Sequence, residues 1–152
     1  MRRHEARWVR RLQVAVGLSI VGALGFAAFV AASGEPQSTL YITLGELRSR
    51  AAESLEIAHG TAASRLPANF VRAQAEQLAP RIASLRDALA KAETHEGATD
   101  ARTARPLSER LLALMQALAE RADTPSAAVP IERELRGIVE RLVPLARSAR
   151  PG

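Results

Sequence analysis

A run of 21 residues without a charge, from Leu12 to Ala32, constrains this chain more than any other feature of its sequence. At 1.5 Å rise per residue, a helix of that length spans about 31 Å, which matches a hydrocarbon core of roughly 30 Å. Trp8 stands one turn before the run, where an amphipathic ring suits the headgroup region of a bilayer. The run therefore predicts a transmembrane helix over residues 12–32.

The charge in front of this run predicts its orientation. Residues 1–11 hold five arginines against one glutamate, a net charge of +4, whereas residues 33–152 hold 16 Lys/Arg against 15 Asp/Glu, a net charge of +1. Basic residues that flank a membrane helix stay on the cytoplasmic side. We expect a basic cytoplasmic arm over residues 1–11 and an inner-membrane location, with the main domain periplasmic or extracellular. The residues that set this topology are Arg2, Arg3, Arg7, Trp8, Arg10 and Arg11.

A cleaved secretory signal is the alternative interpretation of the same segment. The basic start fits it, and Val30-Ala31-Ala32 supplies small residues for a cleavage site. The apolar run is longer than the roughly 7–15 residues usual for such a signal, which favours a permanent anchor. In both cases residues 33–152 are translocated to the far side of the membrane.

Small side chains recur along one side of the predicted membrane helix. Residues four apart lie on the same helix face, and small residues there let a second helix approach closely in lipid. The pattern predicts a helix–helix contact in the membrane, although a chain rich in alanine also produces such a ladder by chance. The residues concerned are Ala15, Ser19, Gly22, Ala23, Ala27 and Ala31.

Residues 40–148, after a linker over residues 33–39, carry helical rather than strand patterns. Thr43-x-x-Glu46 resembles a capping box and predicts the start of a first helix, which should end near Leu66 because Pro67 follows. A second helix should run from Phe70 with a kink or restart at Pro80. Its apolar face is predicted from Phe70, Gln74, Leu78, Ile82, Leu85, Leu89 and Ala92, and that of the first helix from Leu44, Leu47, Ala51, Leu55, Ala58 and Ala62.

The second half of this region predicts two further helices. The polar stretch 95–105 is expected to be one long loop, and Pro106 and Pro130 are each expected to open a helix. Pro144 should bend the last turn, before a tail over residues 149–152. The predicted seams are Leu107, Leu111, Leu114 and Leu118 in the third helix, and Ile131, Leu135, Ile138, Leu142 and Leu145 in the fourth.

These patterns predict an all-α fold: one N-terminal transmembrane helix followed by a small antiparallel bundle of about four helices. The short turns between amphipathic helices are typical of an antiparallel bundle. Because the last two helices look shorter, three packed helices with one loose helix remain an alternative. Aromatic residues make up only 3% of the chain, so the core must be built from Leu and Ala.

The sequence lacks the residue patterns of known catalytic chemistry. It contains no cysteine, and its histidines, His4, His59 and His95, are isolated, so no zinc-ligand set is predicted. Glu132, Glu134 and their arginine neighbours are spaced like a solvated helix face. We therefore predict no catalytic, cofactor-binding or metal-binding residues, no cofactor and no enzymatic activity. Nucleic-acid binding is also not expected, because the excess charge is confined to the N-terminal arm and aromatic side chains for base stacking are few.

The functional expectation follows from this architecture. The chain is predicted to be a non-enzymatic accessory or structural subunit of a larger membrane assembly, such as a respiratory, photosynthetic or transport complex. Its expected partners are other membrane-protein subunits, met through the transmembrane helix and the outer bundle, and the lipid bilayer; a small-molecule ligand is not expected. The alternative is a membrane-anchored periplasmic sensor or chaperone-like binding module.

Overall fold

The computed structural model describes residues 36–94 and 98–149. They form four α-helices and, within these ranges, no strand: α2 (Pro36–Ala62), α3 (Ala68–Ala92), α4 (Thr99–Glu120) and α5 (Pro125–Ser148). The predicted all-α bundle is thus confirmed for the described part of the chain. None of these helices is long and apolar enough to cross a membrane, and the predicted span 12–32 lies outside the described residues.

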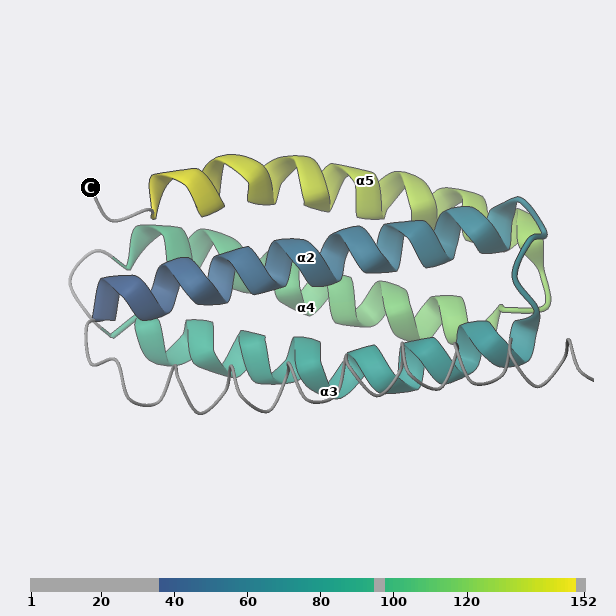
Figure 1. Cartoon of the computed structure of the whole chain (residues 1–152), viewed down its shortest axis with the longest axis horizontal. Coiled ribbons are helices and arrows are strands. Elements are labelled where there is room, and N and C mark those ends of the chain that lie inside the picture. The colour runs from purple at the N-terminus through teal and green to yellow at the C-terminus, as the bar shows by residue number, and fades with distance from the viewer. Residues whose placement is uncertain (1–35, 95–97, 150–152) are drawn as a thin grey trace, which may run out of the picture. The chain divides into compact units, whose positions relative to one another are not determined.

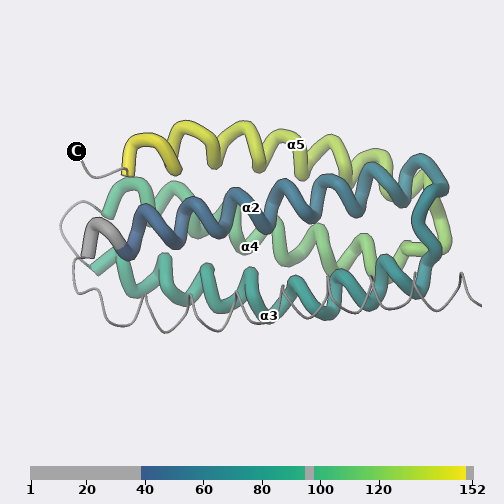
Figure 2. Tube along the Cα trace, viewed as in Figure 1, coloured from purple at the N-terminus to yellow at the C-terminus, as the bar shows by residue number. Residues whose placement is uncertain are grey.

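The four helices alternate in direction and pack around one common core. Figures 1 and 2 show α2 and α4 running one way and α3 and α5 the other, with both the α2–α3 and α4–α5 turns at the same end. The most extensive packing is between α2 and α5 and between α3 and α4, whereas α2 and α4 face each other across the diagonal. All four helices are 22–27 residues long, and α5 packs extensively against α2, so the alternative of a loose fourth helix is wrong.

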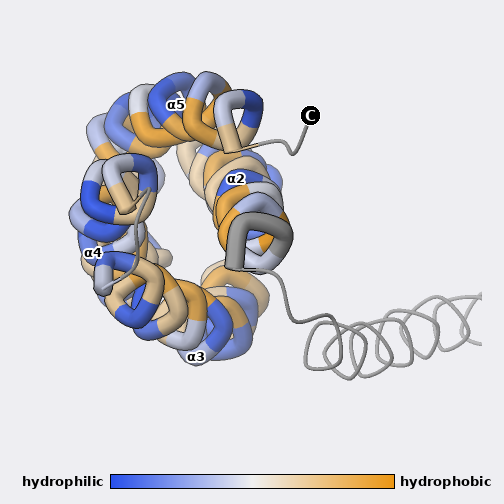
Figure 3. Tube along the Cα trace, turned by 90° about the vertical axis from the view of Figure 1, so that its left-hand side faces the viewer, coloured by the Kyte–Doolittle hydropathy of each residue, from blue (hydrophilic) through white to orange (hydrophobic). Residues whose placement is uncertain are grey.

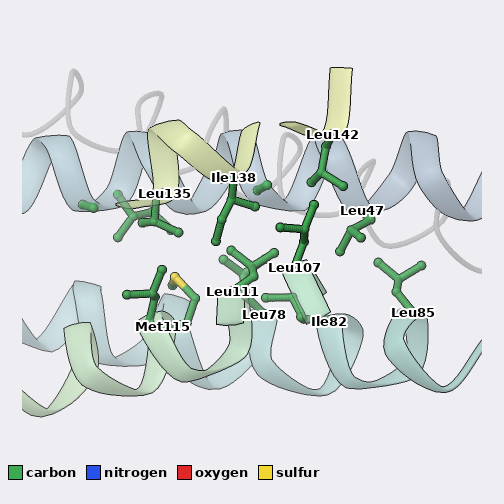
Figure 4. Close-up of a cluster of buried hydrophobic side chains, with 14 of the residues drawn as sticks. Leu47, Leu78, Ile82, Leu85, Leu107, Leu111, Met115, Leu135, Ile138 and Leu142 are labelled. Atoms are coloured by element: carbon green, nitrogen blue, oxygen red, sulfur yellow. The ribbon is translucent and has the colours of Figure 1, made fainter. Parts of the chain in front are cut away.

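Leucine-rich seams from all four helices form the core, as the 3/4 spacing predicts. Figure 3 shows the hydrophobic side of each helix turned inward, and Figure 4 shows how these side chains meet. Leu47, Leu111 and Ile138 are among the side chains with at most 1% exposure. The predicted residues confirmed as buried are Leu44, Leu47, Ala51, Ala58, Leu78, Ile82, Leu85, Leu89, Leu107, Leu111, Leu114, Leu118, Ile131, Leu135, Ile138 and Leu142.

The first two helices differ from expectation near their starts. α2 begins at Pro36, so residues 36–39, assigned to the linker, are helical. The capping-box interpretation of Thr43 is wrong, because its hydroxyl donates to the carbonyl of Thr39 inside the helix. In α3 the seam begins at Val71 and Ala75, and Phe70 is 43% exposed. Val71 and Ala75 continue the spacing of Leu78 and Ile82, whereas Phe70 lies about 100° around the helix from Val71.

Prolines inside the helices account for the other differences between the predicted and the observed helix bounds. Pro80, Pro106, Pro130 and Pro144 all lie inside continuous helices, so the predicted restart at Pro80 and the helix starts at Pro106 and Pro130 are wrong. A proline leaves the carbonyl four residues earlier without its helical partner. Each of these four prolines is exposed, as is the residue four before it, so water can satisfy that carbonyl. The stretch 95–105 was predicted to be one long loop, but residues 99–105 belong to α4, which starts at Thr99.

The turn between α2 and α3 contains the one non-glycine residue with positive φ in the described ranges. Ser64 has φ 55° and follows the end of α2. Its N–H donates to the Thr61 carbonyl over 2.9 Å, and the Arg65 N–H donates to the Gly60 carbonyl over 2.8 Å. These are the paired bonds of a Schellman C-cap, in which glycine is the usual residue at the position of Ser64. Gly60 is also part of this motif. A Cβ at its position would meet the Leu66 side chain at 2.7 Å, so glycine leaves room for that side chain.

Ser64→Gly is expected to stabilise the bundle by about 1 kcal/mol, because glycine adopts this conformation without the cost borne by an L side chain. Thermal unfolding followed by circular dichroism should show a rise in Tm of about 4 °C. Ala63→Gly, one residue earlier, is the control and should give no such gain. An unchanged or lower Tm for Ser64→Gly would contradict this assignment of the cap.

Candidate functional site

The predicted membrane contact surface lies outside the described residues. This holds for the small-residue strip Ala15, Ser19, Gly22, Ala23, Ala27 and Ala31, and for the topology anchors Arg2, Arg3, Arg7, Trp8, Arg10 and Arg11. Their roles as a contact strip and as topology anchors remain predictions. A second candidate site is the end of the described bundle that carries the α2–α3 and α4–α5 turns (Figure 1). We call it the turn end, defined by residues 58–73 and 116–132.

Four polar side chains, three from the turn end and Arg136 from the next turn of α5, meet where the last turns of α2 pack beside α5. His59 Nδ1 lies 3.2 Å from Glu132 Oε1, and Arg136 Nη2 donates to the same oxygen over 2.8 Å. On the other side of the ring, Arg65 Nη2 lies 2.9 Å from His59 Nε2. The cluster joins residues 73 positions apart and ties α2, the α2–α3 turn and α5 together.

The partners of His59 define which ring nitrogen carries the proton in this arrangement. An arginine guanidinium has only donors, so Nε2 must accept the hydrogen bond from Arg65 and carries no proton. Nδ1 then carries the proton and donates to Glu132. In this arrangement neither ring nitrogen is open to a third group.

Glu132 is the one group in the described ranges whose pKa clearly departs from its ordinary value. Burial raises the pKa, but hydrogen bonds from His59 and Arg136 and the electrostatic attraction of both residues outweigh that effect, so the pKa is lowered. The side chain is 17% exposed, against 48% for His59. The cluster therefore stabilises the carboxylate form of Glu132 at a partly shielded position.

This arrangement is a clamp that joins α2, the α2–α3 turn and α5. A general base needs an open basic nitrogen within reach of a substrate proton, and Arg65 occupies that nitrogen of His59. No group of three or more His, Cys, Asp or Glu side chains within residues 36–94 and 98–149 is placed to hold a metal ion. The cluster is a specific contact between helices, and its strength depends on the charge of Glu132.

Acidification should selectively weaken this clamp. A carboxylate whose pKa is lowered by folding stabilises the protein above its unfolded-state pKa, and this contribution is lost as pH falls through the folded-state pKa. We expect the wild type to melt above Glu132→Gln at neutral pH, and the gap to close below a pH of about 4. Melting of the full chain in mild detergent measures this, with Glu140→Gln as the control for lost charge. A gap that stays constant or widens in acid would contradict the role of Glu132.

Sequence reasoning missed this cluster. Glu132 was assigned to a solvated face and His59 to an ordinary helix position. Their pairing depends on the alignment of α2 against α5, which local spacing does not reveal. The one usable signal was the position of His59 next to Ala58, because a residue beside the buried stripe lies at a helix–helix boundary.

Other ion pairs between structural elements lie on the surface. Arg110 Nε donates to Glu134 Oε2 over 2.8 Å and joins α4 to α5, but both side chains are about half exposed. Arg72 contacts Asp123 and joins the start of α3 to the α4–α5 turn. Exposed pairs of this kind contribute about 0–1 kcal/mol each. They help align the helices, but packing of the core supplies most of the stability.

The turn end also carries the two large apolar side chains that the described bundle leaves exposed. Phe70 at the start of α3 is 43% exposed, and Val129 near the start of α5 is 44% exposed. Single exposed apolar residues are normal on protein surfaces. Both of the large apolar side chains that the described bundle exposes thus lie at the turn end.

Comparison with known proteins finds no matching family model, no matching curated protein and no matching solved structure.

Proposed function

We propose that this chain is a single-pass membrane protein that serves as an accessory or structural subunit of a larger membrane complex, such as a respiratory, photosynthetic or transport assembly. The observation that carries the proposal is the uncharged run over residues 12–32 behind an arginine-rich arm. Such a run is long enough to cross a bilayer, and the preceding arginines keep the N-terminus cytoplasmic. The bundle then lies on the periplasmic or extracellular side of the inner membrane.

The start of α2 adds a constraint on where the bundle can work. Only residues 33–35 separate the proposed span from the first residue of α2. Four residue steps join Ala32 to Pro36 and reach about 14 Å at most, so the start of α2 stays near the bilayer surface. A domain tied this closely can meet the outer parts of neighbouring membrane subunits, but it cannot range far from them.

The contact within the membrane is proposed to run along the small-residue strip. Ala15, Ser19, Ala23 and Ala27 recur at every fourth position, which would leave a shallow groove for a helix of another subunit. Association in lipid depends on such close packing rather than on hydrophobicity. No catalytic step is assigned to the chain, and the proposed role is to hold or position its partners.

Extraction of the tagged full chain in mild detergent tests this proposal. We expect a defined set of membrane proteins to co-purify in constant proportion, and to remain associated through size-exclusion chromatography. A chain that purifies alone from its native membrane, as a stable and monodisperse species, would contradict the accessory-subunit role.

Exposed Phe70 and Val129 favour a second candidate function, a membrane-anchored sensor or chaperone-like binding module. In that case the turn end of the bundle, rather than the membrane helix, would make the functional contact. A fragment of residues 36–149 that is soluble alone and gains thermal stability with a specific ligand would favour this second function.

A further inference from the structure

The end of the bundle opposite the turn end gathers segments that are distant in the sequence. The start of α2, the end of α3, the start of α4 and the end of α5 all lie there, as Figure 1 shows. We call it the anchor-side end, defined by residues 39–43, 89–94, 98–105 and 142–149. It includes the part of α2 that follows directly on the proposed membrane span.

The anchor-side end is more basic than the turn end. It carries Lys91, Arg102, Arg105 and Arg147 against Glu93 and Asp100, a net charge of +2. The undescribed segments next to it carry Glu35, Glu96 and Arg150, which lower this net charge to +1. The turn end carries three arginines, Arg65, Arg72 and Arg121, against Glu120, Asp123 and Glu132, a net charge of zero.

The two acidic side chains of the anchor-side end already have partners within the bundle. Arg105 Nε lies 2.8 Å from Glu93 Oε1, and the Ser148 hydroxyl donates to Asp100 over 2.8 Å. Lys91, Arg102 and Arg147 are exposed, and the described part of the chain offers no ion pair to any of them. Three cations in the terminal turns of three different helices thus remain available to an external anion.

We propose that the anchor-side end docks on the anionic surface of the bilayer through Lys91, Arg102 and Arg147. This inference rests on the membrane anchor of the proposed function. The three-residue connection limits the start of α2 to about 14 Å from the span, which is comparable with the Debye length of roughly 8–10 Å. Phosphate groups of the lipids are therefore within electrostatic reach of these side chains. The only tyrosine, Tyr41, is half-buried in the second turn of α2, where an amphipathic ring suits the interface.

Docking at this end has a consequence for the rest of the bundle. α2 has 27 residues, so the turn end lies about 40 Å along the helix axis from the anchor-side end. A bundle docked by its anchor-side end holds Phe70 and Val129 away from the lipid, where a second protein can reach them. The lipid contact thus separates the part of the bundle used for orientation from the part available to partners.

The test uses the full chain reconstituted in vesicles of phosphatidylcholine alone or of phosphatidylcholine and phosphatidylglycerol in equal amounts. Because the chain has no cysteine, Ala90→Cys places a single donor dye on the exposed side of the last turns of α3. Energy transfer to an acceptor in the headgroup layer then reports how close the anchor-side end lies to the surface. Each basic residue is expected to raise the ratio of docked to undocked bundle by about fivefold in anionic vesicles.

Two charge-matched variants in the Ala90→Cys background separate docking from general attraction. The triple variant Lys91→Gln, Arg102→Gln and Arg147→Gln should lose the extra energy transfer in anionic vesicles, as should the unmodified chain at high salt. The control with Arg48→Gln, Arg121→Gln and Arg133→Gln removes the same charge elsewhere and should retain it. All six positions are exposed, and circular dichroism confirms that both variants fold.

The possible failures are distinguishable. If the chain is removed from the vesicles by alkaline extraction, the membrane anchor is wrong and this inference falls with it. If the chain stays in the membrane but energy transfer is equal in both kinds of vesicle, docking is wrong and the anchor stands. Equal loss of transfer in the two triple variants would likewise overturn the assignment to Lys91, Arg102 and Arg147.

Discussion

Leu111→Asp is expected to abolish the cooperative unfolding transition of the bundle. Leu111 is fully buried on the seam of α4, where Figure 4 shows it among side chains from the other helices. Truncation of such a leucine to alanine already costs about 2–5 kcal/mol. A buried carboxylate without a partner adds a desolvation penalty, and the sum approaches the roughly 5–15 kcal/mol of a whole domain. Far-ultraviolet circular dichroism with heating or urea measures the loss.

Arg110→Ala is the matched control, because it changes the neighbouring residue on the outer side of α4. Arg110 pairs with Glu134, but the side chains are 53% and 46% exposed, so the loss should be about 0–1 kcal/mol. We expect a cooperative transition with a slightly lower midpoint. Similar tolerance of both substitutions would mean that α4 is rotated from the orientation described above.

Ala23→Leu should detach the chain from its membrane partners while leaving it inserted. Leucine is favourable at the centre of a membrane helix, so insertion is not impaired. In the proposed contact, a larger side chain at position 23 would occupy the space beside Ala15, Ser19 and Ala27 and prevent close approach of a second helix. Co-purification in mild detergent should fall to the level of an unrelated membrane protein, and the amount of chain in the membrane should stay constant.

Leu24→Ala separates packing from anchoring, because position 24 lies about 100° around the helix from position 23. This change lowers the hydrophobicity of the span but leaves the strip intact, so partners should be retained. If Ala23→Leu recovers the same partners in the same amounts as the wild type, the strip reflects only an alanine-rich composition. Association would then have to come from the outer bundle.

Core positions were predictable because leucine and isoleucine at 3/4 spacing mark the buried face of an amphipathic helix. Leu107, Leu111 and Leu118 are buried as expected. The start of α4 was missed because Ala101 and Ala104, both fully buried, sit within a polar stretch and have little apolar signal. Alanine adds little hydrophobicity, but its small size lets helices pack closely, which only the three-dimensional arrangement reveals.

Proline rules also worked only in part. Pro125 occupies the first turn of α5, the position that suits its missing N–H. Pro106 and Pro130 satisfy the same local rule, yet both lie inside helices. Burial of one face over several turns contributes more than the hydrogen bond that an exposed proline removes. The balance between these two effects is set by tertiary packing, which explains why the helix starts were misplaced.

The polar contacts were less predictable than the core. His59 and Glu132 lie on helices that are not consecutive, and their contact depends on the rotation of both. Phe70 was assigned to the core because it shares a four-residue spacing with Gln74 and Leu78, whereas Val71 takes that position. The absence of a catalytic motif and the predicted membrane segment rest on the sequence alone.

The central claim, one membrane-spanning helix with the bundle outside the cytoplasm, is tested most directly by thiol labelling in cells. Ser126→Cys introduces the only cysteine of the chain, at an exposed position at the start of α5. When the outer barrier is opened and the inner membrane is intact, an impermeant thiol reagent should label this residue as fully as it does after complete lysis. Labelling that appears only after the inner membrane is broken would contradict the account.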